Sequence, residues 1–256
     1  MDLGLRDLVC VLTGSTAGVG LSAARMLAEE GARVVTCSRR EEPPAVGEAL
    51  HVSVDLARRG APEELVRRAE AELGPVDVLV NNVGDSYLAQ FEDLSEEQWD
   101  AMWQLNVMSY VRGIQAVLPG MRERGRGVIV NVSSTAGKRP STGMPNYTVT
   151  KAAVLSLSRL VADLYAKDGI RCNAVAPGPT LSDTWLAPGR LADQQAEQSG
   201  KSREEVLSAV GAGRPLGRLA EPDEIGAVIV FLCSERSSYV TGAAWSADGG
   251  TVPVII

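Results

Sequence analysis

Short apolar runs alternate with longer stretches rich in Ala, Leu and Glu, and this alternation restricts the fold of the chain more than any other feature. The strand-like runs cover residues 7–13, 33–37, 50–54, 76–80, 128–130, 170–175 and 243–246. Strands that alternate with helices predict a parallel sheet with helices on both faces. No Pro/Gly/Ser-rich linker divides the 256 residues. We therefore expect one α/β domain over residues 1–256, with a doubly wound parallel sheet.

A glycine-rich turn joins the first strand to the first helix. Its sequence is Gly14-Ser15-Thr16-Ala17-Gly18-Val19-Gly20, and the helix that follows ends near Gly31. Glycines at such a turn let the backbone approach a diphosphate, whose charge the helix N-terminus favours. Because the turn directly follows a strand and precedes a helix, it predicts a dinucleotide site and a Rossmann-type sheet better than a plain turn.

The second strand ends in Ser38-Arg39-Arg40, where nucleotide folds often carry an acidic residue for the adenosine ribose. Ser38 can hydrogen-bond a 2′-phosphate and Arg39 can bind it bidentately, whereas a carboxylate would repel it. This pattern favours NADP(H). The alternative is that Arg39 and Arg40 are solvated loop charges, partly offset by the two glutamates that follow.

Tyr147 and Lys151 lie four residues apart in a helix-like segment, so they share one face of it. A free phenol has a pKa near 10, and an ammonium about 4 to 6 Å away would stabilise the phenolate by roughly 3 to 4 kcal/mol. Tyr-x-x-x-Lys pairs are common on helix surfaces by chance. Ser134, at the end of the preceding strand, favours a catalytic interpretation because α/β sheets place their chemistry there.

Composition excludes several other classes of function. The net charge of −7, without a basic stripe, argues against nucleic acid as a partner. The apolar run Leu8–Leu12 is too short for a signal peptide or a membrane span, so we expect a cytoplasmic protein with no membrane partner. The four cysteines are scattered, which suits reduced core thiols, and His51 is the only histidine. We therefore expect no metal site and no Ser-His-Asp triad.

Two further segments bear on the site and on assembly. Ser95 and Gln98 form a capping-box pattern, which starts a helix that runs past Asn106 to about Met121. Residues 181–218 look irregular apart from a helix after Ser202, and they are interpreted as a substrate lid or as a mobile surface loop. The helix after Lys151 is apolar on more than one face, which fits packing against a partner subunit.

Taken together, these residues resemble the short-chain dehydrogenase/reductase family over nearly the whole chain. Thr13-Gly14-x-x-x-Gly18-x-Gly20 looks like its cofactor turn, and Asn81-Asn82-Val83-Gly84 is similar to its Asn-Asn-Ala-Gly motif. The catalytic tetrad of the family is matched by Asn106, Ser134, Tyr147 and Lys151. Val83 departs from the usual Ala, and Ala247 stands before Asp248 where the family often has Val.

The resemblance also implies a set of contacts to the cofactor. Asp55 would contact the adenine, Lys151 the nicotinamide ribose, and the Pro177-Gly178 turn would close over the nicotinamide, with Ser182 where the family usually has Thr. The implied cofactor-binding residues are Gly14, Ser15, Thr16, Gly18, Val19, Gly20, Ser38, Arg39, Arg40, Asp55, Leu56, Asn82, Val83, Gly84, Tyr147, Lys151, Pro177, Gly178 and Thr180.

Within the family the chain looks most like the 3-oxoacyl carrier-protein reductases and related ketoreductases. The resemblance implies reduction of a ketone by NADPH, in which Ser134 binds the carbonyl, Tyr147 donates the proton and Asn106 holds a water beside Lys151. Alternatives are NAD-dependent oxidation of a secondary alcohol and cofactor sensing without catalysis. The family usually forms homotetramers, or homodimers, through helices that here span about 97–121 and 146–167.

The side chains that we expect to line the substrate pocket mix apolar and small residues. They favour a medium-sized, largely apolar ketone over a sugar. We expect this ketone to be either a free small molecule or an acyl group linked to a carrier. The expected wall comprises residues 85–88 and 135–137, Met144, Pro179, Trp185 and Leu186.

Overall fold

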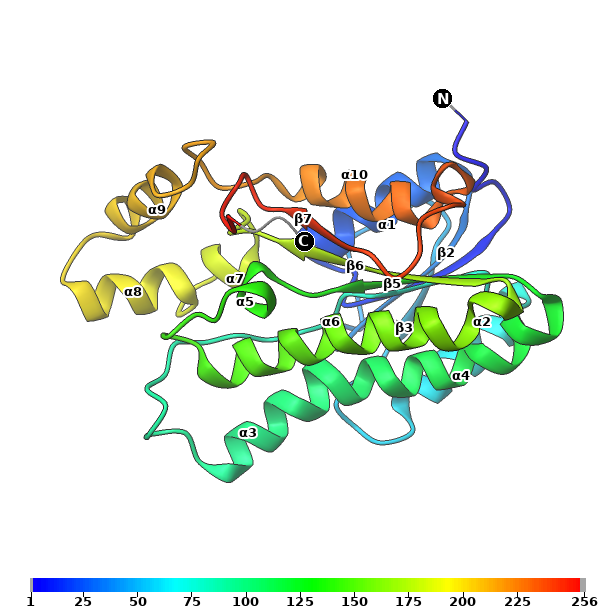
Figure 1. The fold of residues 1–256 in the computed structure, drawn as a ribbon, viewed down its shortest axis with the longest axis horizontal. Coiled ribbons are helices and arrows are strands. Elements are labelled where there is room, and N and C mark those ends of the chain that lie inside the picture. The colour runs from blue at the N-terminus through cyan, green and yellow to red at the C-terminus, as the bar shows by residue number, and fades with distance from the viewer. Residues whose placement is uncertain (1, 254–256) are drawn as a thin grey trace.

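A seven-stranded parallel sheet forms the centre of the computed structural model, which describes residues 2–253 (Figure 1). Its strand order is β3-β2-β1-β4-β5-β6-β7, and each neighbouring pair is parallel. The strands are β1 (Val9–Thr13), β2 (Arg33–Ser38), β3 (Leu50–Ser53), β4 (Val78–Asn81), β5 (Gly127–Val132), β6 (Ile170–Pro177) and β7 (Ala244–Ala247). The expected α/β class with a doubly wound parallel sheet is confirmed.

Helices cover both faces of this sheet. The α-helices are α1 (Gly18–Glu29), α2 (Ala61–Leu73), α3 (Glu96–Trp103), α4 (Ser109–Arg124), α5 (Thr135–Lys138), α6 (Pro145–Tyr165), α7 (Asp183–Leu186), α8 (Leu191–Ser199), α9 (Arg203–Ala212) and α10 (Pro222–Cys233). Short 3₁₀ turns, η2 (Ala166–Asp168) and η3 (Glu235–Ser237), follow α6 and α10. No helix within residues 2–253 has both the length and the apolar character to cross a membrane.

Two apolar cores lie between the sheet and its helices. One holds side chains of α2, α4 and α6, such as Leu65, Ile114 and Val161. The other lies beneath α1 and α10 and includes Leu27 and Ile229. Figure 1 shows α1 and α10 on one side of the sheet and α2, α4 and α6 on the other. Burial of these apolar faces is the main driving force that fixes each helix to the sheet.

The strand order reverses between β1 and β4. From β1 the chain moves outward to β2 and β3, and it then returns to place β4 on the other side of β1. In open α/β sheets, ligands bind beyond the carboxyl ends of the strands at such a switch point. The glycine-rich turn follows β1 and the Asn81–Gly84 motif spans the end of β4, so both lie at this point.

The region between β6 and α10 differs from its sequence-based prediction. Residues 181–218 were expected to be irregular apart from one helix, but α7, α8 and α9 occupy much of the segment. The prediction was wrong because α7 has only four residues and α8 is short and mostly polar, so neither sequence shows a clear 3.6-residue apolar period. The capping box predicted at Ser95 and the helix predicted after Ser202 are both confirmed.

The helix predicted from Ser95 to about Met121 has an interruption at its centre. Residues Gln104–Met108 form a π turn, η1, between α3 and α4, and the Ser109 N–H donates to the carbonyl of Gln104 five residues earlier. Asn106 lies inside this turn and is fully buried. Single π turns within α-helices occur frequently at functional sites.

Candidate active site

The glycine-rich turn after β1 has the shape that a diphosphate requires. Gly14 and Gly18 have φ angles of +62° and +49°, a left-handed conformation that glycine adopts without strain. A Cβ on Gly20 would lie 2.4 Å from the Gly14 carbonyl oxygen and 2.4 Å from Nδ2 of Asn82. Ala17 provides no side-chain cap for α1, which leaves N–H groups of its first turn for an anion. The turn therefore fits the dinucleotide predicted from the sequence.

The segment after β4 is tied to this turn by hydrogen bonds. The hydroxyl of Thr13 accepts from the N–H groups of Asn82 at 2.8 Å and Val83 at 3.1 Å. Nδ2 of Asn82 donates to the carbonyl oxygen of Gly14 at 2.9 Å. The Asn81–Gly84 motif thus holds the position of the glycine turn.

Two predicted cofactor residues place their side chains in the protein interior. The hydroxyl of Ser15 donates to the Leu12 carbonyl at 2.8 Å and accepts from the Cys37 N–H at 3.0 Å. The side chain of Leu56 packs in the core under α2. Neither side chain is therefore available to a cofactor, and the Ser15 N–H already donates to the Cys37 carbonyl at 3.2 Å. Thr16 is buried, while Val19 is half-buried in the first turn of α1.

Ser38 is the last residue of β2, and Arg39 and Arg40 follow it, both exposed to solvent. The Ser38 hydroxyl accepts from the N–H of Arg40 at 3.0 Å, and the His51 ring bonds the Arg40 carbonyl at 2.8 Å. Asp55 is exposed after β3, and its carboxylate accepts from the N–H of Ala57 at 3.0 Å. Arg40 also lies 3.9 Å from the Asp183 carboxylate of α7. These contacts leave both guanidinium groups accessible to a phosphate.

The four residues of the predicted tetrad come from three different segments. Asn106 lies in η1, Ser134 follows β5, and Tyr147 and Lys151 lie on the first turns of α6. Nζ of Lys151 is 5.8 Å from the centre of the Tyr147 ring. A Cβ on Gly84 would be 3.3 Å from Nζ of Lys151 and 3.2 Å from Oδ1 of Asn106. The fold therefore brings Asn106, Tyr147 and Lys151 together beside the end of β4.

Lys151 is buried and held from two sides. Its Nζ donates to the Val132 carbonyl at 2.9 Å, and its own carbonyl accepts from the Ser133 hydroxyl at 2.7 Å. A Cβ on Gly137 would lie 2.6 Å from the Lys151 carbonyl oxygen, so glycine is needed for α5 to approach α6. The lysine is thus fixed by the end of β5 and by α5.

Burial controls the protonation of the Tyr147 and Lys151 side chains. It raises the pKa of Tyr147 above its ordinary value of 10.0, and a hydrogen bond with the Ser134 side chain opposes this by lowering the pKa. It also lowers the pKa of Lys151 from 10.5 to about 7. The sequence predicted that Lys151 would lower the phenol pKa. In the free protein desolvation outweighs this effect, since a lysine that is only part-protonated near neutral pH exerts only part of its charge.

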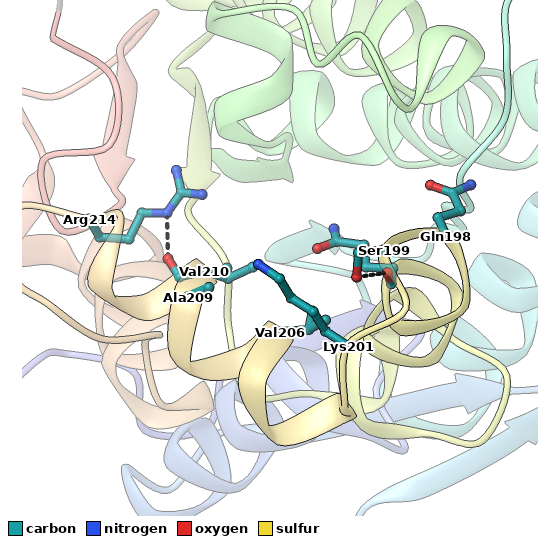
Figure 2. A pocket seen from close by; sticks show the side chains of 8 residues that line it. Gln198, Ser199, Lys201, Val206, Ala209, Val210 and Arg214 are labelled. Atoms are coloured by element: carbon teal, nitrogen blue, oxygen red, sulfur yellow. Dashed lines mark hydrogen bonds between the residues drawn. The ribbon is translucent and has the colours of Figure 1, made fainter.

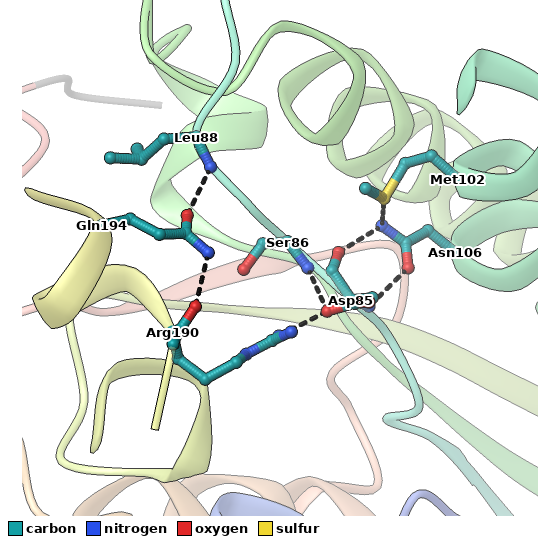
Figure 3. A network of polar contacts seen from close by, with 8 residues as sticks. Asp85, Ser86, Leu88, Met102, Asn106, Arg190 and Gln194 are labelled. Atoms are coloured by element: carbon teal, nitrogen blue, oxygen red, sulfur yellow. Dashed lines mark hydrogen bonds and ion pairs between the residues drawn. The ribbon is translucent and has the colours of Figure 1, made fainter. Parts of the chain in front are cut away.

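Asn106 connects η1 to the loop after β4 (Figure 3). Its Oδ1 accepts from the Asp85 N–H at 2.9 Å, and its Nδ2 donates to the Asp85 carbonyl at 3.0 Å. Nδ2 also lies 3.2 Å from the hydroxyl of Thr150, the residue before Lys151. The side chain of Asn106 therefore positions the backbone of the loop.

Tyr110, Arg190 and Gln194 belong to this region and were missed from the sequence. The Tyr110 hydroxyl donates to the carbonyls of Val83 and Val132 at 2.9 and 3.1 Å, and its ring centre is 5.4 Å from Nζ of Lys151. Its position four residues after Asn106 is the signal that could have revealed it. Arg190 bonds the Asp85 carboxylate across 105 residues of sequence, a pairing that no local pattern indicates.

The predicted turn over the nicotinamide lies at the end of β6. The N–H of Gly178 donates to the Ala247 carbonyl at 3.0 Å, and the Thr180 hydroxyl donates to the Gly178 carbonyl at 2.9 Å. Gly178 and Pro179 also line a cavity of about 350 Å³ beneath the end of β7, with Ile225 and Val228 of α10 among its other walls. Of the expected pocket wall, Pro179 is the one residue that lines this cavity.

A second hollow lies between α8 and α9, away from the tetrad (Figure 2). Its volume is about 420 Å³, and its lining residues are Gln195, Gln198, Ser199, Lys201, Val206, Ala209, Val210 and Arg214. None of the predicted catalytic residues contributes to it. Across residues 2–253, the structure contains no group of three or more His, Cys, Asp or Glu side chains that could hold a metal ion.

This chain is similar to known proteins over nearly its whole length. Residues 14–252 match the family model described as Enoyl-(Acyl carrier protein) reductase. The chain is 33% identical to D-beta-hydroxybutyrate dehydrogenase of Cupriavidus necator, over 97% of this chain and 99% of that protein. It is 36% identical to 3-oxoacyl-[acyl-carrier-protein] reductase FabG of Thermotoga maritima, over 97% and 99% of the two chains.

A solved structure shares the same architecture. The crystal structure of L-sorbose reductase from Gluconobacter frateurii, complexed with NADPH and L-sorbose, superposes with a TM-score of 0.93. The two chains are 34% identical, and the match covers 100% of each.

Proposed function

Because this chain belongs to the short-chain dehydrogenase/reductase family, we propose that it reduces a ketone to a secondary alcohol with NADPH as the hydride donor. Members of the family are oxidoreductases that act on carbonyl and CH–OH groups, and this broader activity holds for the present chain. The observation that carries the narrower proposal is the buried Lys151 held beside Tyr147, a phenol whose pKa the Ser134 side chain lowers. A protein that only bound the nucleotide would not need this arrangement.

The proposed reaction uses Ser134, Tyr147 and Lys151 in distinct roles. When bound, NADPH supplies the hydride that adds to the carbonyl carbon. Ser134 donates a hydrogen bond to the carbonyl oxygen, and Tyr147 donates its phenolic proton to the same oxygen, which completes the alcohol. Lys151 in its protonated form then stabilises the phenolate that remains.

Asn106 and the glycine turn hold the reacting groups in place. Asn106 fixes the loop after β4 and lies next to the path by which a water would return a proton to Lys151. Gly14, Gly18 and Gly20 provide the space for the diphosphate, and the first turn of α1 binds its charge. The nicotinamide ring would lie between these groups and the Pro177-Gly178 turn.

Preference for NADPH is supported by Arg39 and Arg40. Both arginines are exposed after β2, and β2 ends in Ser38 rather than in an acidic residue that would repel a 2′-phosphate. The similar L-sorbose reductase was solved with NADPH. NAD-dependent oxidation of an alcohol is the second candidate, because a relative of similar identity is a D-beta-hydroxybutyrate dehydrogenase.

The proposed substrate is a ketone of the 3-oxoacyl or polyketide type, either free or linked to a carrier. Leu88 and Met144 are half-buried near the tetrad, and Trp185 and Leu186 belong to α7. These apolar side chains suit an aliphatic ketone. Residues 181–218 are the proposed lid over it, since the segment leaves the sheet at the end of β6, on the same edge as the tetrad.

We also propose a homotetrameric assembly in the cytoplasm. Val149, Leu160 and Leu164 of α6 are exposed apolar residues, as is Trp103 of α3. Apolar side chains gathered on neighbouring helices mark a surface that a second copy can cover. All four cysteines are free and buried, as suits a reducing compartment.

The proposal is tested by cofactor titration followed by turnover with a set of carbonyl compounds. NADPH and NADH are titrated by fluorescence, and the set includes a 3-oxoacyl thioester, acetoacetate and a ketose. We expect tighter binding of NADPH and turnover of the thioester, and we expect Tyr147→Phe to bind cofactor normally without turnover. Turnover by Tyr147→Phe would refute the catalytic role of the phenol. Exclusive use of NAD with an alcohol would favour the dehydrogenase.

A further inference from the structure

Two polar bridges join the start of α8 to the loop after β4 (Figure 3). In the first, the guanidinium of Arg190 donates to Oδ1 of Asp85. In the second, Oε1 of Gln194 accepts from the Leu88 N–H at 2.9 Å. The amide nitrogen of the same side chain, Nε2, donates to the Gly189 carbonyl at 2.8 Å. The bridges therefore connect the proposed lid to a loop that borders the tetrad.

The same loop is held from the opposite side by Asn106. Both backbone groups of Asp85, its N–H and its carbonyl, bond the Asn106 side chain. The preceding residue, Gly84, faces Nζ of Lys151. Asp85 is thus the residue at which the lid, the buried Asn106 and the surroundings of Lys151 meet.

The Asp85 carboxylate has more than one partner. Oδ1 accepts from the Ser86 N–H at 2.8 Å as well as from Arg190. The side chains of Asp85 and Arg190 are 44% and 30% exposed, so solvent screens the pair only in part. A charge-assisted bond of this kind fixes direction as well as distance.

We propose that Asp85 and Arg190 form a positioning pair. The pair holds α8 against the loop after β4 and thereby fixes the position of the Asp85 backbone relative to the Asn106 side chain. Neither side chain needs to touch the reacting atoms. The inference rests on the proposed function, because Asn106 and Lys151 are part of the catalytic group only in that proposal. Loss of the pair would leave the catalytic groups present but would loosen the lid that closes over the substrate.

Steady-state kinetics of Arg190→Ala test the proposal directly. We expect KM for the ketone to rise about tenfold, with kcat changed by less than about threefold, as for a lost contact of roughly 1.4 kcal/mol. Arg190→Lys should recover most of the loss because it restores a cation opposite Asp85. Lys201→Ala removes another cation from the same segment and should leave both constants unchanged.

A double-mutant cycle separates the pair from general damage to the segment. Asp85→Asn keeps an acceptor for the Ser86 N–H but removes the negative charge that Arg190 binds. If the two side chains act together, Asp85→Asn will raise KM in the wild-type background and have little further effect in Arg190→Ala. Independent, additive effects of the two substitutions would overturn the pairing.

Hydrogen exchange provides a readout that does not depend on turnover. The Leu88 amide donates to Gln194, and the Ser86 amide donates to Asp85. We expect Arg190→Ala to speed exchange at both amides and across residues 186–199, whereas Lys201→Ala should match the wild type. Unchanged exchange in Arg190→Ala would refute the inference even in an active enzyme. If exchange is faster in Arg190→Ala but Tyr147→Phe still turns over the ketone, the positioning pair is supported and only the catalytic proposal is refuted.

Discussion

Lys151 makes the stability of the folded chain depend on pH. Burial lowers its pKa from 10.5 to about 7, so between these values the folded chain binds fewer protons than the unfolded chain. The free energy of unfolding contributed by this group therefore rises with pH across that window, and the cost of burying the cation is greatest below about pH 7.

Lys151→Met removes this dependence. We expect the variant to gain stability relative to the wild type below about pH 7, and the gain to shrink as the pH rises toward about 10. Urea denaturation of both proteins at several pH values measures the difference. A difference that does not change with pH would mean that the lysine is not desolvated.

Arg39 is expected to control the choice of cofactor. In Arg39→Asp the carboxylate would repel a 2′-phosphate and accept from the hydroxyls of an unmodified ribose. We expect the Kd for NADPH to rise at least about tenfold and the Kd for NADH to fall. Arg68→Asp, an exposed substitution on α2, is the matched control. Equal responses of the two variants would show that Arg39 acts only through net charge.

At single positions, the sequence could predict which residues lie together where their contacts are local. Tyr147 and Lys151 share a helix face by their spacing, and Ser134 follows a strand that its apolar residues reveal. The Asp85–Arg190 contact lacks such a signal because both residues are ordinary loop charges in the sequence, and only the path of the chain through β5, α6 and β6 brings them together.

Among the elements, the turn into α1 depends on the absence of a side chain at Gly20. In Gly20→Ala the new Cβ would lie 2.4 Å from the Gly14 carbonyl, so the turn must shift. We expect cofactor affinity to fall by at least about tenfold. Fluorescence titration measures this, and Gly120→Ala on α4 is the control because its Cβ would meet only the flexible ends of side chains. Normal affinity in Gly20→Ala would exclude this turn as the diphosphate site.

Ser95 stabilises the start of α3. Its hydroxyl accepts from the Gln98 N–H at 3.3 Å, and the Gln98 side chain accepts from the Ser95 N–H at 2.9 Å. Ser95→Ala should cost about 1 kcal/mol and lower Tm by about 2 to 4 °C. Thermal unfolding of this variant beside Ser199→Ala, at the exposed end of α8, checks the value. A shift no larger than in the control would mean that α3 does not need its cap.

Capping boxes, glycine turns and apolar strands could be predicted because each depends on residues close in sequence. The helices α7 and α8 could not, since α8 buries only Leu191 and Ala192 and otherwise presents polar side chains. The π turn at Asn106 could not be predicted either. Its backbone shift accompanies contacts of the Asn106 side chain with Asp85 and Thr150, which belong to distant segments.

For the whole molecule, the exposed apolar face of α6 predicts self-association. Leu160 and Leu164 are 54% and 58% exposed. Apolar surface gathered in this way is unfavourable in contact with water and marks an interaction site. We expect light scattering to give a mass near four times that of the 27.0 kDa chain. Leu160→Glu should shift the mass toward smaller species, whereas Gln198→Glu adds the same charge elsewhere and should not. A mass near 27.0 kDa for the wild type would contradict the tetramer.

The overall architecture follows from the alternation of strands and helices, whereas the strand order needs the contacts between them. Every strand predicted from its apolar residues is present, although β1 begins at Val9 because Asp7 has a φ of +64°. Buried positions on both faces of β1, β4 and β5 explain why these strands read as continuous apolar runs.

The π turn also sets the rotational phase between α3 and α4. Residues eight apart on an uninterrupted α-helix point about 80° apart around its axis, because each residue advances the chain by about 100°. The wider turn at Gln104–Met108 absorbs much of this difference, and both Met102 before it and Tyr110 after it are buried. On a regular helix with one residue fewer, Met102 and Tyr110 would be seven apart and would point only about 20° apart, so both would also face the interior. The π turn therefore accommodates one additional residue at Asn106 and keeps the buried faces of α3 and α4 in phase.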